Sequence, residues 1–174
     1  LAFDVQPASD PPARRDQVGR GLVVEDSPVY GRLLVQAFRN LGVSAVLVES
    51  VAQARDALIA SVAGARDAAP PFDLVLSDTH LADGRVDALL SFMREGVGPG
   101  VSAHGRSKAL APERQRRGGC LMNLPPVICI SADFEDADGA RLMAAGALDL
   151  LTKDSDVAAF AQRVLRSFAD QHAA

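Results

Sequence analysis

Several short apolar runs of this chain end in a polar or charged side chain. These residues are Glu25 and Asp26 after GLVV, Asp78 after DLVLS, Ser131 after VICI, and Thr152 and Lys153 after DLL. Carboxylates bind hard cations and act as nucleophiles, a hydroxyl donates a hydrogen bond, and an ammonium group attracts phosphate oxygens. These residue types together suit chemistry on a phosphoryl group, provided that the fold brings them to one place.

The expected chemistry depends on how clustered carboxylates are stabilised. Carboxylates in close contact repel one another unless a cation neutralises them, and Mg²⁺ prefers such oxygen ligands. An aspartate between Mg²⁺ and a lysine is suited to attack phosphorus, because both cations offset its repulsion from the phosphoryl oxygens. The predicted product is an aspartyl phosphate on Asp78, with Ser131 donating a hydrogen bond to a phosphoryl oxygen and Lys153 as the cation.

The elements that must position these residues alternate along the chain. Short apolar runs predict strands over 21–26, 44–50, 72–78, 125–131 and 147–152, and segments of helical period predict helices over 27–42, 51–68, 84–96, 135–146 and 155–170. Five such units with nearly continuous apolar strands predict an open doubly wound α/β fold, with a five-stranded parallel sheet covered by helices on both faces. Ligands of such folds bind outside the carboxyl ends of the strands, where the residues above would meet.

The first predicted helix has clear end signals. Ser27 is the expected N-cap, Pro28 occupies the first helical position, and Gly42 ends the helix. Its apolar face is predicted to contain Val29, Leu33, Leu34, Ala37, Phe38 and Leu41. Farther along, Gly84 is expected to adopt a positive φ in the loop after Asp78.

Two segments fall outside this alternation. Residues 1–20 contain prolines and charges of both signs without a period, and they predict a flexible N-terminal tail. Residues 21–171 form the predicted domain, with an inserted basic loop at about 96–124. We expect a solvated insertion rather than a docking surface for an acidic partner, because long glycine-rich loops more often move than bind. It lacks the interleaved aromatics of a base-stacking surface, so nucleic acid is not an expected partner.

Composition limits the binding partners, the cellular location and the kinds of metal site that can be expected. The 174-residue chain is 48% hydrophobic with a net charge of −4, which gives no general attraction to nucleic acid or anionic membranes. It has neither an apolar run long enough to span a membrane nor a signal peptide within 1–20, so a cytoplasmic location is expected. Cys129 is expected to be a buried reduced thiol and Cys120 an exposed one, and the scattered histidines do not have zinc-site spacing.

The same residues resemble the receiver domain of two-component response regulators. The resemblance rests on LVVED, DLVLSDTHLADG, ICISA, DLLTK, and the Gly146–Ala147 pair before the last strand. These motifs keep their order and spacing over 21 to about 170, apart from the inserted loop. The resemblance implies a flavodoxin-like sheet with strand order 2-1-3-4-5. The chain ends soon after the last predicted helix, which predicts a stand-alone receiver or one excised from a longer protein, and its leading Leu1 indicates processing or truncation.

The resemblance also implies a metal site. Asp26 would bind Mg²⁺, or Mn²⁺ in its place, directly, with Glu25 alongside through water. The carboxylate of Asp78 and the main-chain carbonyl of His80 would complete the protein ligands. The His80 side chain would modulate the phosphoryl lifetime or face solvent.

The remaining roles concern the phosphoryl group. Asp78 would be the phosphoacceptor, Ser131 the conformational sensor and Lys153 the phosphate-binding cation. The donor would be a sensor histidine kinase or a histidine phosphotransfer protein. The chain would then be a self-phosphorylating acceptor with autophosphatase activity rather than a conventional enzyme, and relatives commonly form homodimers through the face of the fourth and fifth helices.

Three positions depart from the family pattern and leave alternatives open. Leu150 stands where an aromatic residue usually couples to the hydroxyl sensor, Asp154 replaces the proline that usually follows the lysine, and Ala82 replaces a proline after the phosphoacceptor. One alternative is therefore a phosphate-independent interaction module on the same fold. A second, weaker one is a Mg²⁺-dependent phosphohydrolase, which would need a further acid or base.

A structural interpretation of the strand-end residues also exists. Asp26 could cap the first helix, Asp78 could begin a turn, and Ser131 with Asp133 could cap the fourth helix. We favour one shared site, because several independent caps falling at one edge of the sheet are less probable than a single crevice.

Overall fold

The computed structural model describes residues 17–62, 70–95 and 124–172. Outside the described residues lie 1–16 of the predicted tail, 63–68 of the second predicted helix, and 96–123 of the predicted insertion, which include Cys120. The predicted tail extended to residue 20, but Arg20 already belongs to the first strand. The backbone just before the first strand is held in place by Asp73, whose carboxylate accepts hydrogen bonds of 2.8 Å from the amides of Gly19 and Arg20.

The core of the fold is the predicted five-stranded parallel sheet. Its strands are β1 (Arg20–Val24), β2 (Ser44–Val48), β3 (Leu74–Asp78), β6 (Val127–Ser131) and β7 (Asp149–Thr152), in the order β2-β1-β3-β6-β7. Counted without the small hairpin described below, this is the expected order 2-1-3-4-5. Every residue of the central strands β3 and β6 is buried, which explains their continuous apolar sequence.

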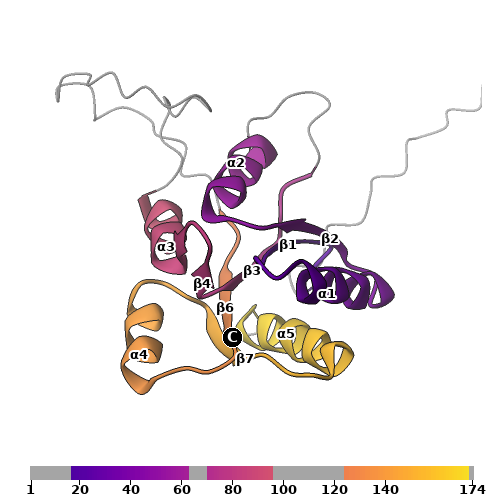
Figure 1. The fold of residues 1–174 in the computed structure, drawn as a ribbon. Coiled ribbons are helices and arrows are strands. Elements are labelled where there is room, and N and C mark those ends of the chain that lie inside the picture. Colours follow the sequence, from indigo (N-terminus) through magenta and orange to yellow (C-terminus); the bar gives the residue numbers. More distant parts are fainter. Residues whose placement is uncertain (1–16, 63–69, 96–123, 173–174) are drawn as a thin grey trace, which may run out of the picture.

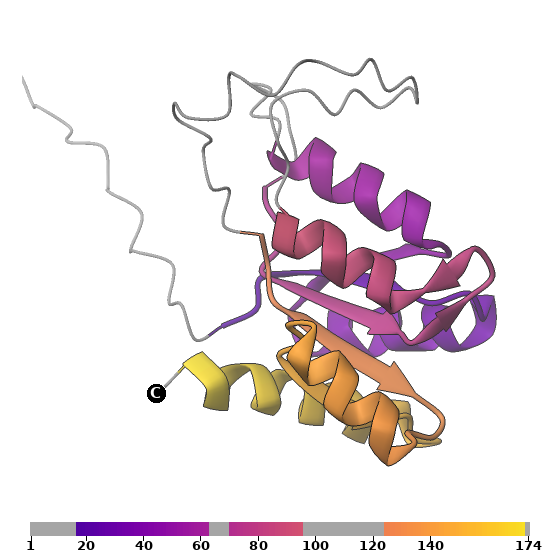
Figure 2. The ribbon, with the colours of Figure 1, turned by 90° about the vertical axis from the view of Figure 1, so that its left-hand side faces the viewer.

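Five helices cover the two faces of the sheet. They are α1 (Pro28–Asn40), α2 (Val51–Val62), α3 (Val86–Glu95), α4 (Asp136–Ala144) and α5 (Val157–His172). Figure 1 shows α1 and α5 on one face and α2, α3 and α4 on the other, and Figure 2 shows this layering from the side. Each face has its own apolar core, so the sheet is buried on both sides as predicted.

The exposed side of α1 differs from the prediction. Ser27 is the N-cap, with its side chain 3.5 Å from the Tyr30 amide, and Pro28 begins the helix as expected. However, the predicted core residues Val29, Leu33 and Leu41 are 70%, 52% and 38% exposed. The buried strip instead runs through Gly31, Leu34, Val35, Ala37 and Phe38. That list includes a glycine, which an apolar pattern alone does not identify as a contact residue.

A small hairpin after Asp78 was not predicted from the sequence. Strands β4 (His80–Leu81) and β5 (Gly84–Arg85) pair antiparallel, so α3 begins at Val86 rather than at Gly84. Gly84 has φ of 152°, in agreement with the expected positive φ. At the hairpin tip, the Asp83 carboxylate accepts hydrogen bonds of 2.9 and 3.0 Å from the first amides of α2, those of Val51 and Ala52.

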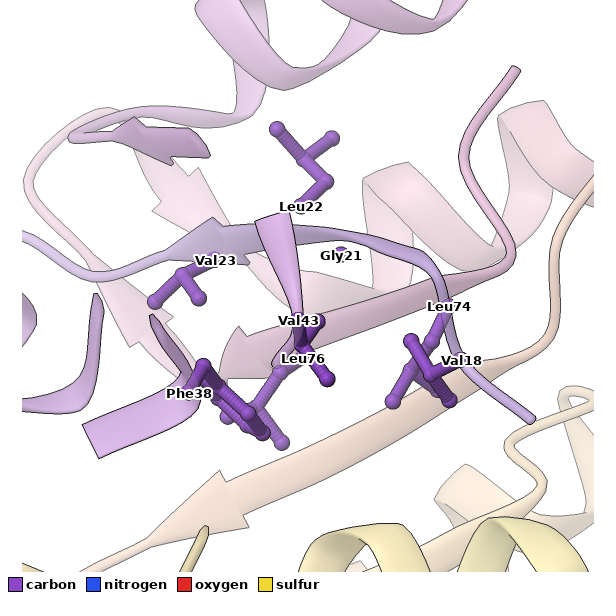
Figure 3. Close-up of a pocket in the computed structure, with 8 residues that line it drawn as sticks. All are labelled: Val18, Gly21, Leu22, Val23, Phe38, Val43, Leu74 and Leu76. Atoms are coloured by element: carbon purple, nitrogen blue, oxygen red, sulfur yellow. The ribbon is translucent and has the colours of Figure 1, made fainter. Parts of the chain in front are cut away.

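The interior near β1 contains a cavity of about 10 Å³. Its lining, drawn in Figure 3, consists of Val18, Gly21, Leu22, Val23, Phe38, Val43, Leu74 and Leu76. A space of this size and apolar character is a packing gap rather than a ligand site, because it offers no polar side chain and room for about one water.

Two further expectations were tested by the fold. Cys129 is a buried free thiol, and burial raises its pKa to about 12. Among the described residues, no helix has the combined length and apolar character needed to cross a membrane.

Candidate functional site

The carboxyl ends of β1 and β3 bring three carboxylates together. Glu25 and Asp26 follow β1 directly, and Asp78 is the last residue of β3. Carboxylate oxygens of these three residues, which we call the acidic triad, all lie within 4.8 Å of one another. Glu25 is 1% exposed and Asp78 8% exposed, whereas Asp26 is open to solvent. The predicted convergence of the carboxylates is therefore present.

Lys153 reaches the acidic triad from the end of β7. Its Nζ lies 2.6 Å from Asp78 Oδ2 and 2.8 Å from Glu25 Oε2. Its own amide donates a 2.7 Å hydrogen bond to the carbonyl of Ser131, which fixes the start of the turn. One ammonium group thus faces three carboxylates, and the site keeps an excess of negative charge.

The pKa values of Lys153 and Glu25 reflect a balance between burial and the attraction of their charged partners. Burial alone would lower the pKa of Lys153, but the hydrogen bonds and charges of Asp78 and Glu25 outweigh it and raise the pKa, so the lysine stays protonated. Burial raises the pKa of Glu25, and the attraction of Lys153 offsets this only in part. Glu25 therefore resists ionisation unless a further cation approaches.

The two carboxylate oxygens of Glu25 have different partners. Oε1 accepts a 3.2 Å hydrogen bond from the Ser27 amide. Oε2 is buried and lies 2.8 Å from Lys153 Nζ. The buried oxygen therefore depends on the charged contact with Lys153.

The other predicted residues lie next to this group. Strand pairing places Asp78 opposite Ile130, so Ser131 follows one residue later on the adjacent strand, where it is 8% exposed. Its hydroxyl accepts a 3.4 Å hydrogen bond from the Asp133 amide. The His80 amide is 3.4 Å from Asp78 Oδ1, while its ring is exposed and lies 3.0 Å from the Thr79 hydroxyl.

The competing interpretation as helix caps does not fit α1 or α4. The cap hydrogen bond of α1 comes from Ser27, so Asp26 is not used as a cap. The N-cap residue of α4 is Glu135, without a side-chain hydrogen bond, so Ser131 does not cap that helix. Asp78 and Ser131 each have one long turn-like contact, with the amides of His80 and Asp133.

Sequence reasoning missed two residues that border the site. Tyr30 places its ring 5.1 Å from Lys153 Nζ, and Asp83 ties the hairpin after Asp78 to α2. An Asp–Gly pair such as Asp83–Gly84 indicates a turn, but its partner helix is distant in sequence. No signal of period or spacing connects Tyr30 to the last strand.

The donor set of the acidic triad fits a hard divalent cation. Oxygen ligands from two neighbouring strand ends and an excess of negative charge are the features that Mg²⁺ sites use. The triad fits less well with softer metals, because the described residues near it offer neither thiolate nor a second imidazole besides the exposed His80.

Comparison with known proteins yields relatives by structure alone. No family model and no curated protein matches the sequence. Among solved structures, the HemR receiver domain of Leptospira biflexa superposes with a TM-score of 0.58 at 19% identity, over 86% of this chain and 94% of that one. The receiver domain of a histidine kinase from Syntrophus aciditrophicus gives 0.57 at 22%, over 87% and 91%.

A third example agrees with these two. The receiver domain of the Francisella response regulator 1452 gives a TM-score of 0.57 at 16% identity, over 87% of this chain and 98% of that one. The similarity covers nearly the whole of each solved domain. The chain therefore has the fold of response-regulator receiver domains.

Proposed function

We propose that the chain is a phosphorylation-controlled signalling switch whose Asp78 accepts a phosphoryl group. The observation that carries the proposal is the placement of Asp78, buried at the end of β3 with Lys153 Nζ 2.6 Å away and two further carboxylates beside it. The donor is the phosphohistidine of a sensor histidine kinase or histidine phosphotransfer protein, and the exchange takes place in the cytoplasm.

In the proposed reaction, an Asp78 carboxylate oxygen attacks the phosphorus of the donor. A P–O bond forms while the P–N bond to the donor imidazole breaks, and the departing imidazole keeps the electron pair and takes up a proton. Lys153 exchanges its contact with Asp78 Oδ2 for one to a phosphoryl oxygen, and the Ser131 hydroxyl donates to another. The product is an aspartyl phosphate with the protein's other charges unchanged.

The acidic triad and the main-chain carbonyl of His80 would hold the metal ion, Mg²⁺ or Mn²⁺. When bound, the ion offsets the repulsion between the Asp78 carboxylate and the phosphoryl oxygens. Asp26, the exposed member, would bind it directly, and buried Glu25 would act through a water.

A second candidate function is a phosphate-independent interaction module, favoured by the surroundings of Leu150. This side chain is half-buried against the core beneath α4, and a methyl group built on Gly139 of that helix would lie 3.5 Å from Leu150 Cδ1. Leucine has no ring or hydroxyl to follow the state of Ser131. The output of phosphorylation must therefore pass through backbone shifts of β6 and β7, or be absent.

The deciding experiment is intact-mass spectrometry after incubation with acetyl phosphate. The parent should gain one phosphoryl group only with Mg²⁺ present, because Asp78 is the acceptor. Asp78→Asn should gain none, whereas Asp138→Asn, which changes a carboxylate on α4 outside the acidic triad, should gain it at the parental rate.

Absence of labelling in a folded parent would support the phosphate-independent module. Continuous hydrolysis of a small phosphoester such as p-nitrophenyl phosphate would instead indicate a phosphohydrolase. Either result would contradict the proposed switch.

A further inference from the structure

The third side of the Lys153 ammonium group faces an aromatic ring. Asp78 and Glu25 contact Nζ at 2.6 and 2.8 Å, and the centroid of the Tyr30 ring lies 5.1 Å from the same atom. This distance is within the range in which a ring face attracts a cation. Tyr30 is half-buried on the first turn of α1, and it is the only tyrosine of the chain.

The hydroxyl of Tyr30 contacts the turn that follows the lysine. It donates a hydrogen bond of 3.5 Å to the carbonyl of Asp154, the residue after Lys153. On the other side, Arg163 Nη2 lies 2.5 Å from the carbonyl of Thr152. Side chains of α1 and α5 therefore flank the backbone around Lys153. Asp154 follows Lys153 in place of proline, and the described residues contain no cis peptide bond.

Tyr30 reaches this position because α1 packs closely on the sheet at the next residue. A methyl group built on Gly31 would lie 2.7 Å from Leu47 Cδ1 and 3.4 Å from Glu25 Cγ. Glycine permits this approach without displacing the Leu47 side chain. The close contact brings the first turn of α1, and with it the Tyr30 ring, over the end of β7.

The chemistry of the ring distinguishes Tyr30 from an ordinary packing residue. An aliphatic side chain would cover Lys153 but would not attract it, whereas the negative face of a phenol ring does. Burial raises the pKa of Tyr30, so its hydroxyl remains a donor throughout the neutral range.

We propose that Tyr30 is a positioning residue that holds the Lys153 ammonium group toward Asp78 through its ring, with its hydroxyl making only a minor contact with the following turn. The inference rests on the proposed function, in which Lys153 binds the incoming phosphoryl group. A lysine held in this way reaches the reacting oxygen without a search among rotamers, so Tyr30 acts on the rate of phosphoryl transfer rather than on the binding of the metal.

The first test is spectroscopic and does not require phosphorylation. The lysines of the chain are Lys108 and Lys153, so protein labelled with ε-¹³C lysine gives two assignable signals, and Lys108→Arg identifies the one from Lys153. The Tyr30 ring current should shift the Lys153 signal away from that of Lys108. Tyr30→Phe should keep this shift and Tyr30→Leu should lose it. An unchanged Lys153 signal in Tyr30→Leu would overturn the proposal.

The second test separates rate from affinity. In acetyl phosphate labelling, Tyr30→Leu should lower the maximal rate roughly tenfold. Its half-saturating Mg²⁺ concentration should stay near the parental value. Tyr30→Phe should restore most of the rate, because the 3.5 Å hydroxyl contact is long and weak. The matched control is Val29→Ala, which alters the adjacent residue, 70% exposed, and should change neither readout.

These outcomes are separable from failure of the proposed function. If Tyr30→Leu is labelled at the parental rate, or if Tyr30→Phe is as slow as Tyr30→Leu, the positioning role of the ring is wrong. If the parent itself takes no phosphoryl group, the proposed function fails, and the Lys153 signal still decides whether Tyr30 holds the lysine.

Discussion

Two groups of charged side chains in this molecule are expected to affect its stability in opposite ways. The acidic triad with Lys153 sets three carboxylates against one ammonium group in a largely buried crevice. A second group, which we call the surface cluster, joins Arg85 of β5 and Asp87 of α3 to residues of α4. Its α4 members are Asp138 and Arg141. Here two guanidinium groups meet two carboxylates.

Burial and charge balance separate the two groups. The side chains of the surface cluster are 33–44% exposed, whereas those of Glu25, Asp78 and Lys153 are 1%, 12% and 18% exposed. The surface cluster is balanced and screened by solvent, so it stabilises the contact of α3 and α4 only slightly. The acidic triad is unbalanced, and its members Glu25 and Asp78 are desolvated, which costs stability and leaves a demand for a cation. The comparison separates an unbalanced group of buried charges at the strand ends from a balanced group of exposed charges between α3 and α4.

Removal of Lys153 should have the largest effect on stability. Lys153→Met leaves Glu25 and Asp78 buried without a cationic partner, and the free energy of unfolding should fall by about 3 kcal/mol. Urea unfolding at pH 7 without divalent ions measures this. Added Mg²⁺ should recover part of the loss. A cost no greater than that of Arg141→Met would show that the two groups do not differ as described.

Neutralisation of Glu25 should raise the free energy of unfolding, whereas removal of Lys153 should lower it. Because the pKa of Glu25 is raised in the folded state, its contribution to stability is fully present below its unfolded pKa and is lost as pH rises through the folded value. Glu25→Gln removes this loss, so the variant should be more stable than the parent at pH 7 without Mg²⁺. The difference should shrink in acid. Unfolding measured at pH 4 and pH 7 gives the comparison, and a variant less stable at pH 7 would refute it.

Asp83 provides an intermediate case, an exposed carboxylate whose partners are backbone amides. Its hydrogen bonds to Val51 and Ala52 cap α2, and Asp83→Ala should lower the free energy of unfolding by about 0.5–1 kcal/mol. Burial slightly opposes the charged form, but the backbone hydrogen bonds lower the pKa of Asp83. Its contribution is thus present above its unfolded pKa and lost as pH falls through the folded value. Thermal unfolding should show a smaller cost at pH 3 than at pH 7.

Disruption of the surface cluster should have the smallest effect. Arg141→Met removes its contacts with Asp87 and Asp138, and the free energy of unfolding should change by at most about 0.5 kcal/mol. The change should disappear in 1 M salt, because exposed pairs are screened. Acetyl phosphate labelling should remain at the parental rate. A loss of unfolding free energy above about 2 kcal/mol that does not depend on salt would contradict this prediction, because it is typical of buried ion pairs.

The residues predicted from the sequence are those whose position follows from strand direction alone. Parallel strands must end at one edge, so Glu25, Asp26, Asp78 and Lys153 were expected to meet, and their carboxylates and ammonium group do. Ser131 follows from the same rule. The strand order was also correct.

The missed features depend on contacts between distant segments. Val29 and Leu33 follow the apolar period of α1, but helix rotation is fixed by close packing at Gly31, which a hydropathy pattern does not reveal. The β4–β5 hairpin is only two residues on each side, too short for an alternating pattern. Tyr30 meets Lys153 only because the first turn of α1 lies beside the end of β7 in the folded chain.

The most direct test of the account is thermal unfolding with beryllofluoride, which mimics a phosphoryl group on a carboxylate and is independent of phosphoryl lifetime. With Mg²⁺ and beryllofluoride together, the melting temperature of the parent and of Asp138→Asn should rise by about 5 °C or more. Asp78→Asn should show no such rise, and neither ligand alone should reproduce it. No rise in the parent, or an equal rise in Asp78→Asn, would contradict a phosphoryl-accepting site at the end of β3.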